Sequence, residues 1–177
     1  MTISFKTINP ESLNDNFFRR IDREWMLITA GTLTRFNTMT ASWGTLGILW
    51  HKPIAICFIR PQRLTFQFAE KHNYFTLSFL EEQYRDILNF CGSHSGRDTD
   101  KIARTGLKPV ELGAESISFE QASLVFECRK LYADFIKAEN FLVRELIDKN
   151  YPGQDFHRFF IGEIVKCYSS SSPFSIL

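Results

Sequence analysis

Three cations stand where they could bind an anion. Arg60 and Arg63 follow directly after an apolar run at residues 54–59, and Lys101 ends a polar segment at residues 95–101. An arginine side chain offers paired N–H donors that match the oxygens of a phosphate group, and a lysine adds a point charge. The same residues could be ordinary surface cations beside acidic neighbours, and the residue types alone leave both interpretations open.

A run of small residues that ends in a tryptophan precedes these arginines. Thr40, Ala41 and Ser42 would let hydroxyl and backbone N–H groups approach the polar rim of a planar heterocycle, and Trp43 could cover its apolar part. The alternative is a β-turn with a packed tryptophan. The segment therefore indicates either a ring-binding site or a tight turn.

Two further hydroxyl residues each have two possible roles. Thr65 stands at the start of a predicted helix, where its side chain could donate to an anion or cap the helix. Ser78 alternates with Phe75, Leu77 and Phe79 along a predicted strand. It could line a ligand on the polar face of that strand, or it could be a half-exposed strand serine.

The spacing of other residues disfavours several kinds of chemistry. The four histidines and four cysteines share no metal-ligand spacing, so we expect no metal. The chain contains neither G-x-G-x-x-G nor G-x-x-x-x-G-K-[ST], which disfavours both common nucleotide-binding folds. No Ser-His-Asp arrangement is recognisable, which disfavours a hydrolase.

The elements that must position these residues are mostly strands. Many strands, few helices and no regular alternation between them favour a barrel over a doubly wound sheet. Strands are predicted at residues 25–30, 54–59, 74–80, 122–132 and 157–168, and near Val110 and Ile117. Helices are predicted from Asn9 onward and at residues 64–71, 81–91, 98–105 and 139–148, with turns at residues 31–37 and around Gly44 and Gly47. The inward faces are predicted to carry Leu13, Phe17, Phe18 and Ile21 in the first helix, and Val143, Leu146 and Ile147 in the last.

Length and composition indicate one domain. The 177 residues include 18 phenylalanines, enough for a single core at about residues 20–168 with a C-terminal tail at 169–177. A net charge of +1 gives no reason to expect nucleic acid or an anionic membrane as partner. We see no signal peptide and no apolar stretch of membrane-spanning length. The cysteines are far apart and are expected to be buried and reduced, which favours a cytoplasmic protein: Cys57, Cys91, Cys128 and Cys167.

Several short motifs together resemble the flavin reductase-like family of FMN-binding split barrels, and within it the flavoredoxin-like branch. They are NTMTASW at 37–43, KP at 52–53, RPQR at 60–63, FTLSF at 75–79, SGRDTDK at 95–101, ECRKLY at 127–132, and His157 with GEI at 162–164. They occur in the family's order, and the resemblance covers about residues 20–168. It implies a mainly β Greek-key split β-barrel with flanking helices, and FMN bound at a homodimer interface.

The resemblance also implies roles for single residues. Arg60, Lys101 and the loop from Ser95 would hold the flavin phosphate, with Arg63 and Thr65 beside them. Residues 40–43 would face the isoalloxazine ring, and Ser78 could line the flavin side of the sheet. His157 matches a position near the nicotinamide or substrate, and its effect would then titrate near an ordinary pKa of about 6.5. The alternative for His157 is a strand-end histidine bonded to a backbone carbonyl.

The function implied first is that of an NAD(P)H:flavin oxidoreductase. NADH or NADPH would reduce the bound FMN, which would pass electrons to free flavin or another acceptor. A second interpretation is a flavoredoxin-like electron carrier reduced by a partner protein, and a third is a flavin-binding module without turnover. Members of one fold use a cofactor in different ways, so the sequence leaves these three open.

Overall fold

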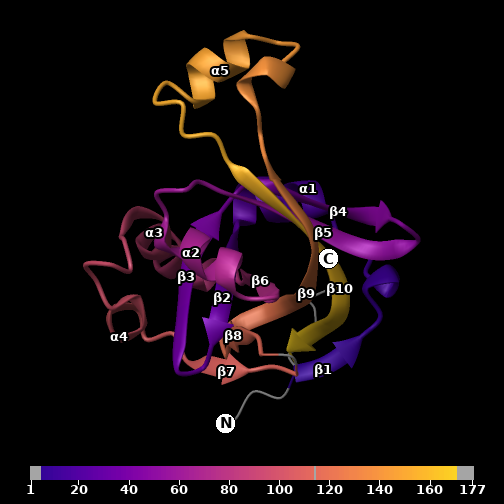
Figure 1. Cartoon of the computed structure of the whole chain (residues 1–177). Coiled ribbons are helices and arrows are strands. Elements are labelled where there is room, and N and C mark those ends of the chain that lie inside the picture. Colours follow the sequence, from indigo (N-terminus) through magenta and orange to yellow (C-terminus); the bar gives the residue numbers. More distant parts are fainter. Residues whose placement is uncertain (1–4, 114, 171–177) are drawn as a thin grey trace.

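Eight strands form one curled antiparallel sheet. The computed structural model describes residues 5–113 and 115–170. The strands run in the order β3-β2-β6-β9-β10-β5-β4, and β1 pairs with the C-terminal end of β10. Figure 1 shows the sheet wrapping round into a barrel. The bounds are β1 Phe5–Ile8, β2 Met26–Thr32, β3 Arg35–Ala41, β4 Gly44–Leu49, β5 Lys52–Ile59, β6 Tyr74–Leu80, β9 Ala122–Phe135 and β10 Arg158–Ser170, with β7 Pro109–Glu111 and β8 Ile117–Phe119 as a separate pair. The predicted mainly β architecture is confirmed.

Strand β6 shows how the alternating sequence builds two cores. Its odd-numbered aromatic and aliphatic side chains enter the larger core cluster, which includes Phe126 and Phe160 from β9 and β10. A second cluster packs β2 and β9 against α3, through residues such as Leu27 and Leu88. The hydroxyl groups of the even-numbered residues instead meet strand β8, where Thr76 Oγ1 donates to the carbonyl oxygen of Ile117. Apolar burial on one face and hydrogen bonds on the other therefore fix the position of β6 in the sheet.

The turn predicted around Gly44 and Gly47 is wrong, because both glycines lie in strand β4. A Cβ atom on Gly44 would stand 2.9 Å from Met26 Cε and 3.0 Å from the carbonyl oxygen of Ile56. Glycine at this position therefore allows close packing of β4 and does not mark a chain reversal. The actual reversal between β4 and β5 uses two residues with positive φ, Trp50 and His51, at 52° and 57°. This is the tight hairpin geometry that usually takes glycine or asparagine, and no such signal marks it in the sequence.

Short helices cover the part of the barrel beside β3. The predicted helix at residues 64–71 is confirmed as α2 Leu64–Lys71, and α4 Lys101–Thr105 ends at Gly106, whose φ is 70°. The helix predicted at 81–91 is a 3-10 turn, η3 Glu82–Tyr84, followed by α3 Arg85–Ser93. Near the N-terminus Asn9 caps only a single turn, and the chain then continues through two more short helical segments. The single turn is η1 Pro10–Ser12, and the two further segments are α1 Phe17–Arg19 and η2 Arg20–Glu24. Within the described residues, no helix has the length and apolar character needed to cross a bilayer.

The segment between β9 and β10 projects from the barrel as an arm. Figure 1 shows the two strands extending beyond the sheet to a tip that carries η4 Ala138–Asn140 and α5 Glu145–Asn150. We call residues 136–157 the arm. The inward face predicted for this helix is wrong at Val143 and Leu146, which are exposed, whereas Ile147 is half-buried. Their neighbour Leu142 is fully exposed. The inward face predicted for the first helix fails at Phe18, which is 92% exposed, whereas Leu13, Phe17 and Ile21 pack in or against the core.

Candidate functional site

The ends of several elements meet at one groove. Two adjoining cavities, of about 450 and 170 Å³, share Met39, Arg60 and Arg63, and together they form this groove. It is bounded by the C-terminal ends of β3 and β5, the start of α2 and the loop that follows α3. All but one of the residues singled out in the sequence line it: Thr40, Ala41, Ser42, Trp43, Arg60, Arg63, Thr65, Ser95, Lys101 and His157.

The exception is Ser78, and the expectation that it lines the flavin side of the sheet needs correction. Its side chain is fully buried, and its Oγ lies 2.9 Å from Oγ of Ser118 on strand β8. The polar face of β6 at Thr76 and Ser78 is thus covered by β8 and does not open onto the groove. Alternation along β6 was interpreted correctly, but the sequence could not show which element covers its polar face.

Lys101 places a buried positive charge at one end of the groove. The side chain is only 6% exposed, and its Nζ donates to the carbonyl oxygens of Thr38 (2.9 Å) and Cys91 (3.0 Å). Burial lowers the pKa of the Lys101 ammonium group, and Arg63 lowers it further. In the part of the chain that the structure describes, no carboxylate is ion-paired with Lys101. A buried cation held only by carbonyl groups favours an anion as its missing partner.

The two arginines differ in how they are held. Arg63 donates from NH1 to the carbonyl oxygen of Gly92 at 2.8 Å, and it has no acidic partner among the described residues. Arg60 is ion-paired with Asp155, and it donates from NH2 to the carbonyl oxygen of Asn150 at 2.8 Å. This contact with Arg60 holds the pKa of Asp155 below its ordinary value. Arg63 is therefore the freer cation for an anion, whereas Arg60 also ties the base of the arm to the end of β5.

The start of α2 completes the charged end of the groove. The structure rules out Thr65 as the cap of this helix, because the N-cap position is Arg63 and no side chain caps it. The hydroxyl group of Thr65 is instead 2.6 Å from the side-chain amide of Asn37 on β3. Next to them the loop after α3 packs so tightly that a Cβ on Gly96 would meet the Asn37 side chain. One space is therefore surrounded by the backbone at the start of α2, the loop that contains Ser95, and the cations Arg63 and Lys101.

The other end of the groove is aromatic and centred on His157. The ring of Trp43 lies 5.0 Å from that of His157, centroid to centroid, and Nδ1 of His157 is 3.0 Å from the hydroxyl group of Tyr151. Burial lowers the pKa of His157 to about 4, with Arg60 adding to the effect. The expectation that His157 titrates near its ordinary pKa is therefore wrong, and the ring is neutral near pH 7. Its ring partner is a tyrosine and not the backbone carbonyl expected as the alternative.

Tyr151 is the residue at this site that sequence reasoning missed. It is almost fully buried at the base of the arm, and its ring lies under the guanidinium group of Arg60, 5.3 Å away. It stands just after α5, six residues before His157, and no motif marks it. The only available signal was the cluster of aromatic residues, Tyr151 and Phe156, directly before a histidine.

No metal centre accompanies the groove in the described residues. There, no three histidine, cysteine, aspartate or glutamate side chains gather closely enough to hold a metal ion. All four cysteines are buried with free thiols, as the sequence predicts. Burial raises the pKa of Cys91 to about 11 and that of Cys167 to about 12. These thiols are consequently protonated at neutral pH and poorly suited to act as nucleophiles or metal ligands.

Solved structures share this architecture across most of the chain. An FMN-binding domain of a flavin reductases-like enzyme from Shewanella baltica superposes with a TM-score of 0.70 at 16% identity, covering 99% of this chain and 82% of that one. Flavoredoxin of Desulfovibrio vulgaris (Miyazaki F) gives 0.64 at 21% identity, with 84% and 70% covered. An FMN-binding protein from Thermus thermophilus with bound p-hydroxybenzaldehyde gives 0.64 at 23% identity, with 94% and 83% covered. The fold is therefore the split β-barrel that the sequence predicted.

Comparisons based on sequence identify the family of the chain. No curated protein matches the chain closely enough to count as a relative. The family model described as the flavin reductase like domain, in contrast, matches residues 18–176, which is nearly the whole chain. The chain therefore belongs to the flavin reductase-like family.

Proposed function

We propose that the protein binds FMN in the groove and acts as an NAD(P)H:flavin oxidoreductase. The observation that carries the proposal is the polarity of the groove. One end offers a buried lysine and an arginine that have no acidic partner among the described residues, and the other offers an indole and a neutral imidazole. A ligand that fits both ends has an anionic group and a planar ring system, as FMN does. Family membership supports the same cofactor.

At the charged end, Lys101 and Arg63 would hold the phosphate group. The Ser95 hydroxyl group and the start of α2 add neutral donors around it, whereas the hydroxyl group of Thr65 is already bonded to Asn37. Arg60 would contribute its charge at longer range, because Asp155 already accepts one of its N–H groups. Charge-assisted hydrogen bonds of this kind fix both the position and the direction of a phosphate-bearing ligand.

At the aromatic end, residues 40–43 would face the ring system. Small side chains at Ala41 and Ser42 let the backbone come close, and Trp43 and Phe58 provide apolar surface. When bound, FMN supplies the capacity to accept a hydride and to pass electrons on. The protein orients the ring and keeps one face open to the electron donor. With Nδ1 bonded to Tyr151, His157 has Nε2 free of partners among the described residues, so that nitrogen is available to position a nicotinamide.

The experiment that tests the proposal is anaerobic mixing of the FMN-loaded protein with NADH and with NADPH. Fast bleaching of the flavin absorbance with either nucleotide is the expected result. Bleaching only in the presence of a reduced redox protein would instead support the flavoredoxin-like carrier. Absence of any reversible reduction would leave a binding module without turnover. Failure to take up FMN would reject the proposal itself.

We also propose that the protein is a homodimer whose two copies complete the FMN site. The support is apolar surface that a single copy leaves exposed at the arm tip, where Leu142, Val143 and Leu146 lie. We expect Leu142→Glu to weaken the dimer, with Leu33→Glu, an equally apolar but separate exposed site, as the matched control. Light scattering across a dilution series measures both. A wild-type monomer that keeps stoichiometric FMN would contradict the proposal.

A reducing compartment such as the cytoplasm is part of the proposed setting. Its support is the set of four buried, free thiols. Cysteines in an oxidising compartment more often pair into disulfides. Fractionation of cells that express the full-length protein would test this assignment.

A further inference from the structure

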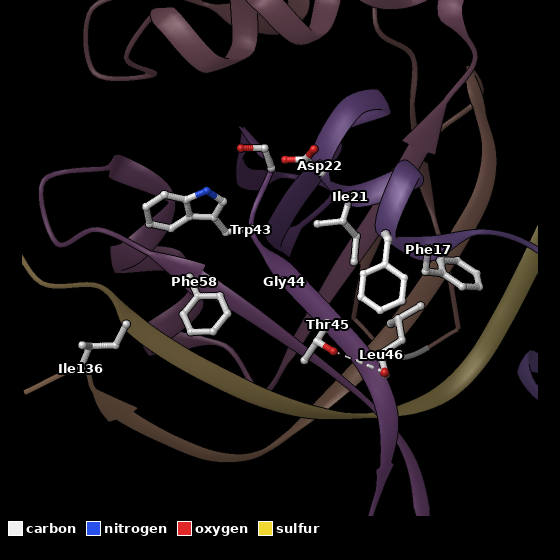
Figure 2. A pocket seen from close by; sticks show the side chains of 11 residues that line it. Phe17, Ile21, Asp22, Trp43, Gly44, Thr45, Leu46, Phe58 and Ile136 are labelled. Atoms are coloured by element: carbon white, nitrogen blue, oxygen red, sulfur yellow. Dashed lines mark hydrogen bonds between the residues drawn. The ribbon is translucent and has the colours of Figure 1, made fainter. Parts of the chain in front are cut away.

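An apolar cavity adjoins the groove at Trp43. It measures about 480 Å³ and shares Ser42, Trp43 and Phe58 with the groove. Figure 2 shows Trp43, Phe58 and Ile136 on one side of the start of β4, and Ile21, Leu46 and Phe17 on the other. Its size falls in the range typical of small-molecule sites, and aromatic walls of this kind suit a planar ligand.

Asp22 places a carboxylate, itself exposed to solvent, at the rim of this cavity. Among the described residues it is the charged member of the lining, and no basic side chain is ion-paired with it there. Figure 2 places it at the end of the cavity away from Thr45 and Leu46. A carboxylate at the edge of an apolar space favours a ligand that brings a positive charge and disfavours a second anion.

We propose that this cavity binds a compact aromatic molecule that carries a protonated amine. The ring lies against Trp43 and Phe58, and the ammonium group reaches the carboxylate of Asp22. The ligand differs in charge from the phosphate-bearing molecule proposed for the groove, so the two sites select opposite charges. The binding stands independently of FMN, although both ligands contact Trp43.

Three indoles of similar size and different charge test the assignment: tryptamine, tryptophol and indole-3-acetate. Calorimetric titration of each into the full-length protein, with and without FMN, is the measurement. We expect tryptamine to bind about twofold to fivefold more tightly than tryptophol, which is the usual range for an exposed ion pair, and indole-3-acetate to bind weakest. Measuring the protein without FMN separates this result from any failure of the proposed function.

Three variants sharpen the test. Asp22→Asn keeps the shape of the side chain and should remove the preference for the amine, whereas Asp148→Asn, at an exposed site in α5, should preserve it. Thr45→Trp, at an exposed position of β4, should fill the cavity and abolish binding of all three indoles. Thermal unfolding checks that each variant is folded.

Several results would overturn the proposal. Equal affinity for the three indoles, or an order unchanged in Asp22→Asn, would remove the role of Asp22. Competition between tryptamine and FMN would assign the cavity to the cofactor site. Binding that is absent in the dimer and present only after dilution to monomer would assign the cavity to a second copy of the chain.

Discussion

Replacing Lys101 with methionine is expected to lower the affinity for FMN about tenfold to a hundredfold and to leave the affinity for riboflavin nearly unchanged. The expected loss corresponds to roughly 1.4–2.7 kcal/mol, the range for one charge-assisted hydrogen bond. The reason is specific to this side chain: it is a buried cation whose observed partners are two carbonyl groups. Riboflavin lacks the phosphate, so it should not depend on this charge. Titration of the flavin-free protein with each flavin, followed by fluorescence, is the measurement.

Lys6→Met is the matched control, because Lys6 lies exposed in β1 and does not line the groove. The control should bind both flavins as the wild type does. Methionine keeps the length of the Lys101 side chain, but it leaves the carbonyl groups of Thr38 and Cys91 without their donor. Thermal unfolding of the variant measures that structural cost separately. An equal loss of FMN and riboflavin affinity would show that Lys101 supports the fold of the groove and does not bind phosphate.

The groove was predictable from the sequence because each of its walls is a short local motif. The residues after the strand at 54–59, the start of the helix at 64–71 and the segment ending at Lys101 each carry a recognisable pattern. Strand β5 and helix α2 form where hydrophobic periodicity places them. Antiparallel pairing in the barrel then brings these walls together. That arrangement was predicted from the family resemblance and not from the local motifs.

The contacts inside the groove were less predictable, because they join distant segments. Arg60 is separated by about ninety residues from Asn150 and Asp155, which hold its side chain. Nothing in the local sequence of either segment signals the pairing. As a result, the sequence treated Arg60 and Lys101 alike, whereas in the structure only Arg60 already has an acidic partner.

The errors in the fold share a second physical cause. Glycine marks a turn in one context and close packing in another, and Gly44 belongs to the second kind. Likewise, the apolar spacing at residues 139–148 is typical of a helix on a sheet, but the arm holds α5 away from the barrel. A periodic pattern identifies an apolar face and cannot say what covers it. In both cases tertiary structure, not local preference, decided the outcome.

His157→Ala is expected to retain FMN but to lose about tenfold to a hundredfold in the rate of flavin reduction, roughly 1.4–2.7 kcal/mol of transition-state stabilisation. The side chain lies at the aromatic end of the groove, away from Lys101. It should therefore position the nicotinamide without binding the phosphate group of FMN. His51→Ala, in the exposed turn between β4 and β5, is the matched control and should reduce at the wild-type rate. Anaerobic stopped-flow reduction at saturating NADH or NADPH is the measurement.

The pH dependence separates a positioning role from an acid–base role. Because burial lowers the pKa of His157 to about 4, the ring stays neutral from about pH 6 to 8, and the wild-type rate should change little across that interval. Tyr151→Phe removes the hydroxyl group bonded to Nδ1 and frees the ring to rotate. That variant should reduce more slowly, by about twofold to tenfold, with FMN affinity unchanged. A wild-type rate that titrates near pH 6.5 would mean that the imidazole is exposed in the working complex. A full rate in both variants would leave His157 and Tyr151 as a structural pair at the base of the arm.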